Sequence, residues 1–294
     1  MRQDSPKLMS RIAFVNGAYR RHAEALVHIE DRGYQFGDGV YEVCEIRDGA
    51  LIDEAPHLAR LERSLAALRI AAPIGLAALK LVMREIVNRN RVRDGLVYIQ
   101  ITRGVAPRDH GFPAAARASV VVTAKAADRR KGEANAGSGV KVVTLPDERW
   151  RRPDIKTLQL LPNVLAKQAA RERGAYEAWL VDAEGRITEG ASTNAWIVSA
   201  DGALITRQAD QSILRGVARQ TALAIIAGEG LRLEERPFSL AEAYGAREAF
   251  LTSAGNGVMP VVAIDGRRIG DGQPGRLTLA LREKFHKYVE VAAV

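Results

Sequence analysis

The sequence predicts a mixed α/β protein of two domains: a smaller N-terminal α/β domain and a larger C-terminal domain that combines an antiparallel β meander with helices. Three observations support this prediction. Valine-rich strand segments recur between leucine-striped helical segments along the chain. A polar, glycine-rich segment at 129–139 is expected to link domains at 1–128 and 140–294. The 294 residues are 47% hydrophobic, which suits one large or two medium domains.

The N-terminal domain begins with a hairpin signal. Asn16-Gly17 lies between short apolar runs at 13–15 and 25–27, and this dipeptide favours a tight turn between strands. A glycine-rich loop is expected at 30–39, followed by a strand at 40–46. The further elements expected here are a strand at 50–52, a helix that Asp53 could cap and that carries Leu58, Leu61, Leu65 and Leu68, a second helix at 76–88, strands at 96–102 and 117–124, and between these strands a rigid loop at 103–113.

The C-terminal domain is expected to start with a strand at 140–145. Pro162 and Gly174 suit the two ends of a helix, and Ser239 with Glu242 forms a capping box that opens another. The remaining expected elements are the meander strands 178–181, 187–189, 195–198 and 203–206, a helix that follows 213–219 and ends near Gly228, strands at 231–236, 248–252 and 258–264, and a last helix with Leu277, Leu281, Phe285 and Tyr288 on its inner face.

Composition bounds the class of protein. The formal net charge of +8 raises a basic nucleic-acid-binding protein as an alternative of a different class. The basic residues come as scattered pairs without interleaved aromatics, so we expect no nucleic-acid partner. Cys44 is the only cysteine and the first eleven residues are polar. We therefore expect a cytoplasmic enzyme with no signal peptide and no membrane partner.

Three ordered motifs carry a resemblance to a known family. They are RGYQFGDGVYE at residues 32–42, DIK at 154–156 and TEG at 188–190. Together they resemble the signatures of fold-type IV enzymes that depend on pyridoxal 5'-phosphate (PLP). Within that group the chain is most similar to D-amino-acid aminotransferases, from about residue 13 to about residue 285.

The resemblance implies a role for Lys156 and for Glu189. Lys156 would be the catalytic residue that carries PLP as a Schiff base, because a displaced lysine amine can then shuttle a proton. Glu189 would keep the ring nitrogen of PLP protonated, so that the ring can withdraw electrons from the substrate. On spacing alone the alternative stays open that Lys156 is a surface lysine and Glu189 a turn acid.

Further cofactor contacts follow from the same resemblance. Arg60 would bind the cofactor phosphate, as a forked guanidinium does well. A helix start after Gly216 favours an anion, and the amides of Val217 and Ala218 would hold the phosphate there. Leu214 would pack on the ring, and Thr252 and Ser253 would touch the phosphate. Ala254 departs from the family pattern, in which many relatives have a threonine. No metal ligand is among the expected site residues.

The expected substrate contacts lie in the first domain. In similar enzymes a tyrosine, an arginine and a histidine at the positions of Tyr41, Arg108 and His110 bind the substrate carboxylate. The loop that carries Arg108 and His110 comes from the neighbouring subunit in relatives, so the resemblance implies a homodimer. It also implies amino transfer from D-alanine-like amino acids to 2-oxoglutarate or pyruvate. The alternatives within the fold are a branched-chain L-aminotransferase, an (R)-selective amine transaminase and an aminodeoxychorismate lyase.

Overall fold

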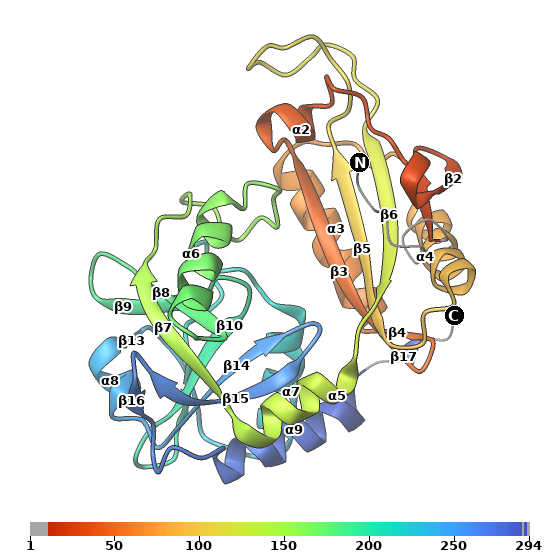
Figure 1. Cartoon of the computed structure of the whole chain (residues 1–294). Coiled ribbons are helices and arrows are strands. Elements are labelled where there is room, and N and C mark those ends of the chain that lie inside the picture. The colour runs from red at the N-terminus through yellow and green to blue at the C-terminus, as the bar shows by residue number, and fades with distance from the viewer. Residues whose placement is uncertain (1–10, 290, 293–294) are drawn as a thin grey trace. The chain divides into compact units, whose positions relative to one another are not determined.

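The computed structural model describes residues 11–289 and 291–292, which group into two compact units (Figure 1). Of the described residues, 11–128, 155–159 and 291–292 belong to the first unit. The second unit consists of Arg129–Asp154 and Leu160–Val289. The short segment that carries Lys156 therefore groups with the first unit, although the sequence led us to expect it in the C-terminal domain. Residues 1–10, which belong to the polar segment in which we expect no signal peptide, lie outside the described residues.

The first unit is built on a seven-stranded antiparallel sheet in the order β17-β4-β3-β5-β6-β1-β2. Its strands are β1 (Ile12–Val15), β2 (Ala18–Arg21), β3 (Gly39–Arg47), β4 (Ala50–Ile52), β5 (Gly95–Thr102), β6 (Ser119–Ala126) and β17 (Val291–Ala292). Its helices are η1 (His22–Glu24), α2 (Arg32–Phe36), α3 (Glu54–Ala67) and α4 (Leu76–Asn90). Helix α3 packs on β3 and α4 packs on β6 and β1.

Strand β3 places a carboxylate on the core side of this sheet. Its side chains alternate in burial, and Val40, Glu42, Cys44 and Ile46 share the buried face. The leucine stripe of α3 covers that face, and Leu58 and Leu61 are 1% exposed. A strand has one residue in two on each face, so Glu42 is committed to the interior by its register. Its charge must therefore be met by partners inside the unit.

Three local predictions for this unit were wrong. Residues 25–27 form no strand: the turn at Asn16 and Gly17 pairs Val15 directly with Ala18, so the return strand β2 starts at once. The expected loop at 30–39 contains the short helix α2, which Asp31 caps by accepting from the Gly33 amide. The expected cap of α3, Asp53, has a φ of 52° and makes no side-chain cap bond.

The second unit is built on a mixed ten-stranded sheet with the main order β12-β11-β10-β14-β15-β7-β8-β9-β13, and β16 pairs with β15. Its strands are β7 (Val140–Pro146), β8 (Glu177–Val181), β9 (Arg186–Gly190), β10 (Asn194–Val198), β11 (Leu204–Thr206), β12 (Leu233–Glu235), β13 (Phe238–Ser239), β14 (Glu248–Ser253), β15 (Gly257–Ile264) and β16 (Arg267–Arg268). Its helices are α5 (Arg129–Ser138), α6 (Leu161–Glu172), α7 (Val217–Gly228), α8 (Leu240–Tyr244) and α9 (Arg276–Tyr288).

The second unit differs from the predicted structure in two places, one in the meander and one in the linker. Strands β9 and β10 are consecutive in the chain but are not neighbours in the sheet order, because β10 pairs with β11 and β14 while β9 pairs with β8 and β13. The expected linker at 129–139 forms helix α5 within this unit. The core is formed by β-sheet side chains such as Trp179, Phe238 and Met259, each fully buried.

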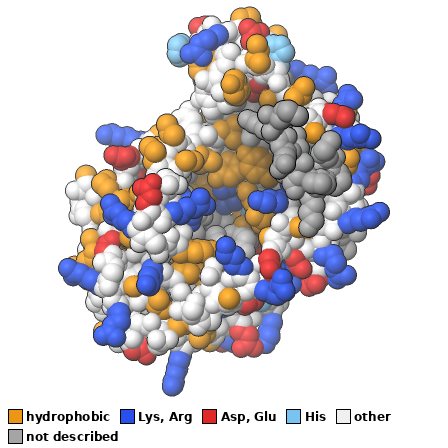
Figure 2. Space-filling view, in the orientation of Figure 1, with side chains coloured by type: hydrophobic (Ala, Val, Ile, Leu, Met, Phe, Trp, Pro, Cys, Tyr) orange, Lys and Arg blue, Asp and Glu red, His pale blue; other side chains and the backbone are white. Residues whose placement is uncertain are grey.

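The surface and the helices of the described residues add two observations. On the face shown in Figure 2, Lys and Arg side chains are dispersed among acidic and apolar groups. No helix in the described part of the chain has both the length and the apolar character needed to cross a membrane.

Candidate active site

Lys156 is attached through its backbone to the start of strand β3. The amide of Tyr41 donates to the Lys156 carbonyl at 3.0 Å, and the amide of Leu158 donates to the Gly39 carbonyl at 3.0 Å. The Lys156 amide also donates to Oγ of Ser64 at 3.3 Å. These bonds fix the backbone of the segment. The Lys156 side chain is half-buried, and its Nζ lies 4.2 Å from the centroid of the Tyr41 ring. The expected catalytic lysine and one expected substrate residue are thus adjacent.

Arg60 belongs to a buried charged group on the same unit. Its Nε donates to Oε1 of Glu42 at 2.7 Å and its Nη2 to Oε2 at 2.8 Å, while Nδ1 of His57 lies 2.9 Å from Oε2. Burial raises the pKa of Glu42, but the charge and hydrogen bonds of Arg60 and a bond from His57 outweigh it and hold this pKa well below its usual range. The expected contact of Arg60 with a phosphate stays a prediction.

His57 is the neutral member of this group. Burial lowers its pKa more than the contact with Glu42 raises it, and the positive charges of Arg60 and Lys156 lower it further. The group therefore carries one negative carboxylate and one positive guanidinium in a fully buried position. The sequence indicated Arg60 as a site residue, but not its pairing with Glu42.

Arg108 and His110 lie together on an exposed loop, where both contact Phe36. The Cζ atom of Arg108 is 4.7 Å from the centroid of the Phe36 ring, and the rings of His110 and Phe36 are 5.4 Å apart. Among the described residues, no hydrogen bond or ring contact joins this pair to Tyr41. The structure therefore brings together two of the three expected carboxylate ligands and places the third beside Lys156.

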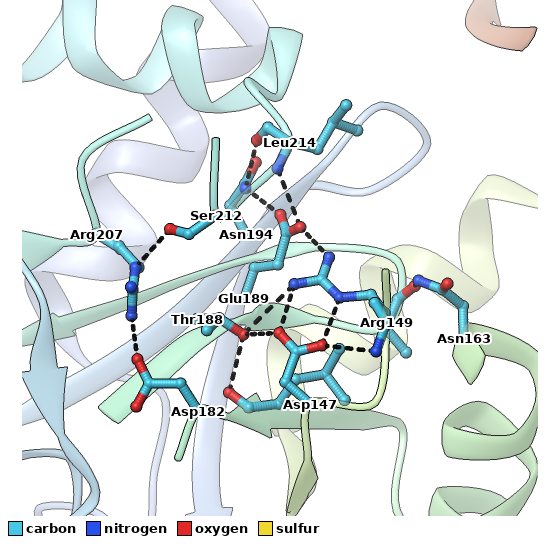
Figure 3. A network of polar contacts seen from close by, with 12 residues as sticks. Asp147, Arg149, Asn163, Asp182, Thr188, Glu189, Asn194, Arg207, Ser212 and Leu214 are labelled. Atoms are coloured by element: carbon cyan, nitrogen blue, oxygen red, sulfur yellow. Dashed lines mark hydrogen bonds and ion pairs between the residues drawn. The ribbon is translucent and has the colours of Figure 1, made fainter. Parts of the chain in front are cut away.

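Glu189 is the centre of a polar network in the second unit (Figure 3). It is 4% exposed and accepts hydrogen bonds from Nη1 of Arg149, from Nδ2 of Asn194 at 2.8 Å and from the amide of Leu214 at 3.0 Å. Burial raises the pKa of Glu189, while the charge of Arg149 and the bonds from Leu214 and Arg149 oppose the rise. Arg149 is itself held by Asp147, through Nε at 2.9 Å and Nη2 at 2.7 Å.

Asn194 connects this carboxylate to the turn before α7. Its Nδ2 also donates to the Leu214 carbonyl at 3.0 Å. A Cβ atom at Gly216 would lie 2.1 Å from Oδ1 of Asn194, so only glycine fits at the start of this helix. No side chain caps α7, and the amides of its first turn, at Val217 and Ala218, have no intrahelical acceptor. Such amides form a site for an anion.

Thr252 and Ser253 lie at the end of β14, beside the start of β10. Thr252 is the register partner of Asn194 and accepts a hydrogen bond from Nε1 of Trp196 at 3.1 Å. It is 1% exposed, whereas Ser253 is half-buried and accepts from Nδ2 of Asn256 at 3.3 Å. The sheet therefore brings these two expected residues next to the network of Asn194 and Glu189.

Several site residues were not identified from the sequence. Asn194 closes the motif-bearing stretch and is the register neighbour of Thr252, but a single sequence does not show this pairing. Arg149 lies in a segment of mixed charge, DERWRR, where nothing separates it from a surface arginine. Phe36 lies in the glycine-rich stretch at 30–39, whose sequence predicts a loop. Only the long-range contacts of the fold identify these three residues.

Three comparisons with known proteins extend these observations. The family model for amino-transferase class IV matches residues 39–264. The D-alanine aminotransferase of Bacillus licheniformis is 43% identical over 263 residues, which are 90% of this chain and 92% of the relative. The D-alanine aminotransferase of Staphylococcus haemolyticus is 39% identical over 278 residues, which are 94% of this chain and 97% of the relative.

Solved structures of the same architecture are more distant in sequence. The branched-chain amino acid aminotransferase of Escherichia coli superposes with a TM-score of 0.87 at 23% identity, covering 95% of this chain and 94% of that chain. The branched-chain aminotransferase of the archaeon Thermoproteus uzoniensis, solved with norvaline, gives a TM-score of 0.85 at 24% identity, covering 96% and 99%. At this identity the likeness concerns the fold, and the fold type expected from the sequence is confirmed.

Proposed function

Because the chain belongs to the class IV aminotransferases, we propose that it transfers the amino group of a D-amino acid, such as D-alanine, to a 2-oxo acid, such as 2-oxoglutarate or pyruvate, with PLP as its cofactor. The observation that carries the substrate class is the identity of 37–43% to relatives called D-alanine aminotransferase over at least 90% of the chain. The branched-chain enzymes share the fold at 23–24% identity and carry no argument about substrate.

The residues of the chain fit PLP. The amides of Val217 and Ala218 would hold its phosphate, next to the close approach at Gly216 that excludes any side chain. Glu189 would accept a hydrogen bond from the protonated ring nitrogen, and Lys156 offers the amine. When bound, PLP supplies an aldehyde that reacts with amines and a ring that withdraws electrons from the α-carbon.

We propose the following division of work among the residues of the chain. Lys156 Nζ would take the proton from the α-carbon of the amino donor, and in the second half-reaction it would deliver a proton to the α-carbon that derives from the 2-oxo acid. Glu189, paired with Arg149, would accept a hydrogen bond from the ring nitrogen and so favour its protonated form. Arg60, Thr252 and Ser253 are proposed as further phosphate contacts, and Leu214 as the residue that packs on the ring.

The substrate carboxylate would be bound by Tyr41, Arg108 and His110. We propose that Arg108 and His110 act in the site of a neighbouring subunit, so the enzyme is a homodimer. Large apolar side chains that are exposed on the first unit support this, notably Leu26 at 78% and Ile29 at 76%.

We also propose a cytoplasmic location, which the single buried thiol of Cys44 supports. We also propose that the chain has two domains, at 1–128 and 140–294.

A half-reaction panel tests this function directly. The purified enzyme, yellow with bound cofactor, is mixed with D-alanine, L-leucine or an (R)-arylalkylamine, without a 2-oxo acid. We expect D-alanine to remove the visible absorbance of the cofactor, L-leucine to leave it, and the amine to act weakly. The Lys156→Ala protein is the control that should not respond. Faster loss with L-leucine than with D-alanine would overturn the substrate class and leave the cofactor assignment standing.

A further inference from the structure

The loop at 104–113 that carries Arg108 and His110 is exposed and needs support from its own subunit. Val105, Arg108, Asp109, His110 and Phe112 are all exposed, and an isolated bridge between Asp31 and Val105 joins the start of the loop to the segment before α2. Ordering such a loop costs conformational entropy for every residue. If the loop were flexible in the free enzyme, part of the binding free energy of the substrate carboxylate would be used to order it, and the affinity would be lower.

Arg32 fixes the backbone of this loop between the two expected ligands. It is 3% exposed, and its Nη1 donates to the carbonyl of Asp109 at 2.6 Å while its Nη2 donates to that of His110 at 3.4 Å. Its Nε donates to Oδ2 of Asp38 at 2.8 Å. A buried guanidinium with a paired charge and planar geometry holds two carbonyl groups in fixed positions.

Asp38 joins this contact to the far end of the loop. It also accepts from Nε of Arg103 at 2.7 Å and from Nη2 of Arg103 at 3.0 Å. The Cζ atom of Arg103 lies 3.7 Å from the centroid of the Phe112 ring, so the same carboxylate stabilises both sides of the loop. Burial raises the pKa of Asp38, but the hydrogen bonds and charges of Arg103 and Arg32 outweigh it and lower this pKa.

Phe36 supports the side chains themselves. Its ring contacts Arg108 and His110 on the loop, and the Cζ atom of Arg32 lies 4.8 Å from the same ring centroid. The helix that carries Phe36 is held close to strand β5, because a Cβ atom at Gly33 would lie 2.2 Å from Cγ2 of Thr102. Helix α2 is therefore packed against the sheet on one side and contacts the exposed Arg108 and His110 through Phe36 on the other.

We infer that Phe36, Arg32 and Asp38 are positioning residues that preset Arg108 and His110 for the carboxylate of the substrate. The inference rests on the proposed function and names the part of the chain that sets its selectivity for carboxylate-bearing substrates. Losing the Phe36 ring should release two side chains that the wild type holds in place. The KM for D-alanine should then rise about 10-fold, with kcat changed less than about 2-fold.

Three variants of the holoenzyme test the inference. Phe36→Leu removes the ring, and Arg32→Lys keeps the charge but loses the fork. Tyr19→Leu is the matched control, because Tyr19 is also half-buried, lies in the same unit and has its own cation–π contact, with Arg89 at 4.2 Å. The readouts are KM and kcat for D-alanine, the inhibition constant of propanoate, which has the carboxylate without the amine, and hydrogen–deuterium exchange of 104–113.

We expect Phe36→Leu and Arg32→Lys to raise KM and the propanoate constant together and to accelerate exchange in 104–113, while Tyr19→Leu changes none of the three. If Phe36→Leu and Arg32→Lys showed the same hydrogen–deuterium exchange and the same propanoate constant as Tyr19→Leu, the inference would be overturned. A loss confined to kcat would overturn it as well. Arg108→Ala separates this outcome from failure of the proposed function: if that variant binds propanoate like the wild type, the carboxylate site itself is wrongly assigned. If it loses propanoate and Phe36→Leu does not, only the positioning role fails.

Discussion

Arg149 and Glu189 form an ion pair in the second unit, with only 7% and 5% of their side chains exposed. Glu189 lies in strand β9, and Arg149 follows strand β7, 40 residues earlier in the chain. Burial favours the neutral form of Glu189, and the positive charge of Arg149 opposes this effect. The charge state of the expected ring-nitrogen partner therefore depends on an arginine that lies outside the recognised motifs.

Replacing Arg149 should damage both stability and cofactor binding. Arg149→Met leaves a buried carboxylate without its cation, which costs about 3–5 kcal/mol when one partner of a buried pair is removed. The pKa of Glu189 should then rise further, and a neutral carboxyl group binds a protonated ring nitrogen poorly. Urea unfolding of the apoenzyme and a cofactor titration measure the two effects. Arg149→Lys, which retains a cation, is the control and should lose less of both.

Replacing Lys156 tests the central assignment. Lys156→Ala should abolish transamination, because no other amine of the expected site can take its place. The variant should bind the cofactor without a bond that borohydride reduction makes permanent, as mass spectrometry of the reduced protein would show. Ser64→Ala is a useful control, since Ser64 contacts Lys156 through the backbone amide and should retain most activity. Near-normal turnover by Lys156→Ala would refute the assignment.

Arg60 should have two separable roles. Arg60→Ala should raise the cofactor dissociation constant and also destabilise the first unit by about 3–5 kcal/mol, because Glu42 would stay buried and unpaired. In the double variant Arg60→Ala/Glu42→Gln both charges are gone, so most of the stability should return. Its cofactor affinity should remain low if Arg60 binds the phosphate. Fluorescence titration of the apoenzyme decides this, and wild-type affinity in the double variant would assign Arg60 a structural role only.

The stability of the enzyme should decrease on mild acidification because of His57. Its pKa in the folded protein is lower than the ordinary value of 6.5, so the unfolded chain binds this proton more readily. The contribution of neutral His57 is complete above pH 6.5 and is lost as the pH falls below that value. Urea unfolding between pH 7.5 and 5.5 measures the slope. His57→Asn, which cannot gain the proton, should show a smaller slope, and an unchanged slope would assign the effect to other groups.

Arg108 should act on the substrate rather than on the cofactor. Arg108→Ala should lower kcat/KM for D-alanine by about 10–100-fold, because a carboxylate loses a charge-assisted, forked contact worth about 1.5–3 kcal/mol. The visible absorbance of the cofactor should stay normal. The rate with a carboxylate-free (R)-arylalkylamine should fall far less. Equal losses on both substrates would indicate that Arg108 supports the fold or the dimer instead.

Signals that act within a few residues predicted their parts of the fold correctly. Asn16 and Gly17 adopt φ values of 49° and 96°, as a two-residue hairpin turn requires, and Ser239 with Glu242 makes both bonds of the capping box. The strand at 40–46 and the leucine-striped helix after Asp53 are also confirmed. Each of these features is stabilised by contacts between near neighbours in the chain.

Features that depend on distant partners could not be predicted. The segment at 129–139 is polar and has little helical periodicity, yet it forms α5 on the second unit, where it contacts β15. Strands β9 and β10 separate because β14, which follows more than 50 residues later, pairs with β10 at Asn194. The basic side chains that contact Glu42 and Glu189 lie 15 to 40 residues away from them, and these contacts are visible only once the sheets are assembled.

The attachment of residues 155–159 to strand β3 also affects how the chain can be produced and divided. Strand β4 pairs with β3 only at Ile46 and Arg47, so on that side the first half of β3 is a strand edge. The Lys156 segment occupies it, with an isolated bridge between Val40 and Thr157. An open edge is a template for aggregation. A fragment that ends near residue 128 would lack this segment and leave the edge of β3 open, so we expect it to self-associate more readily than the full chain.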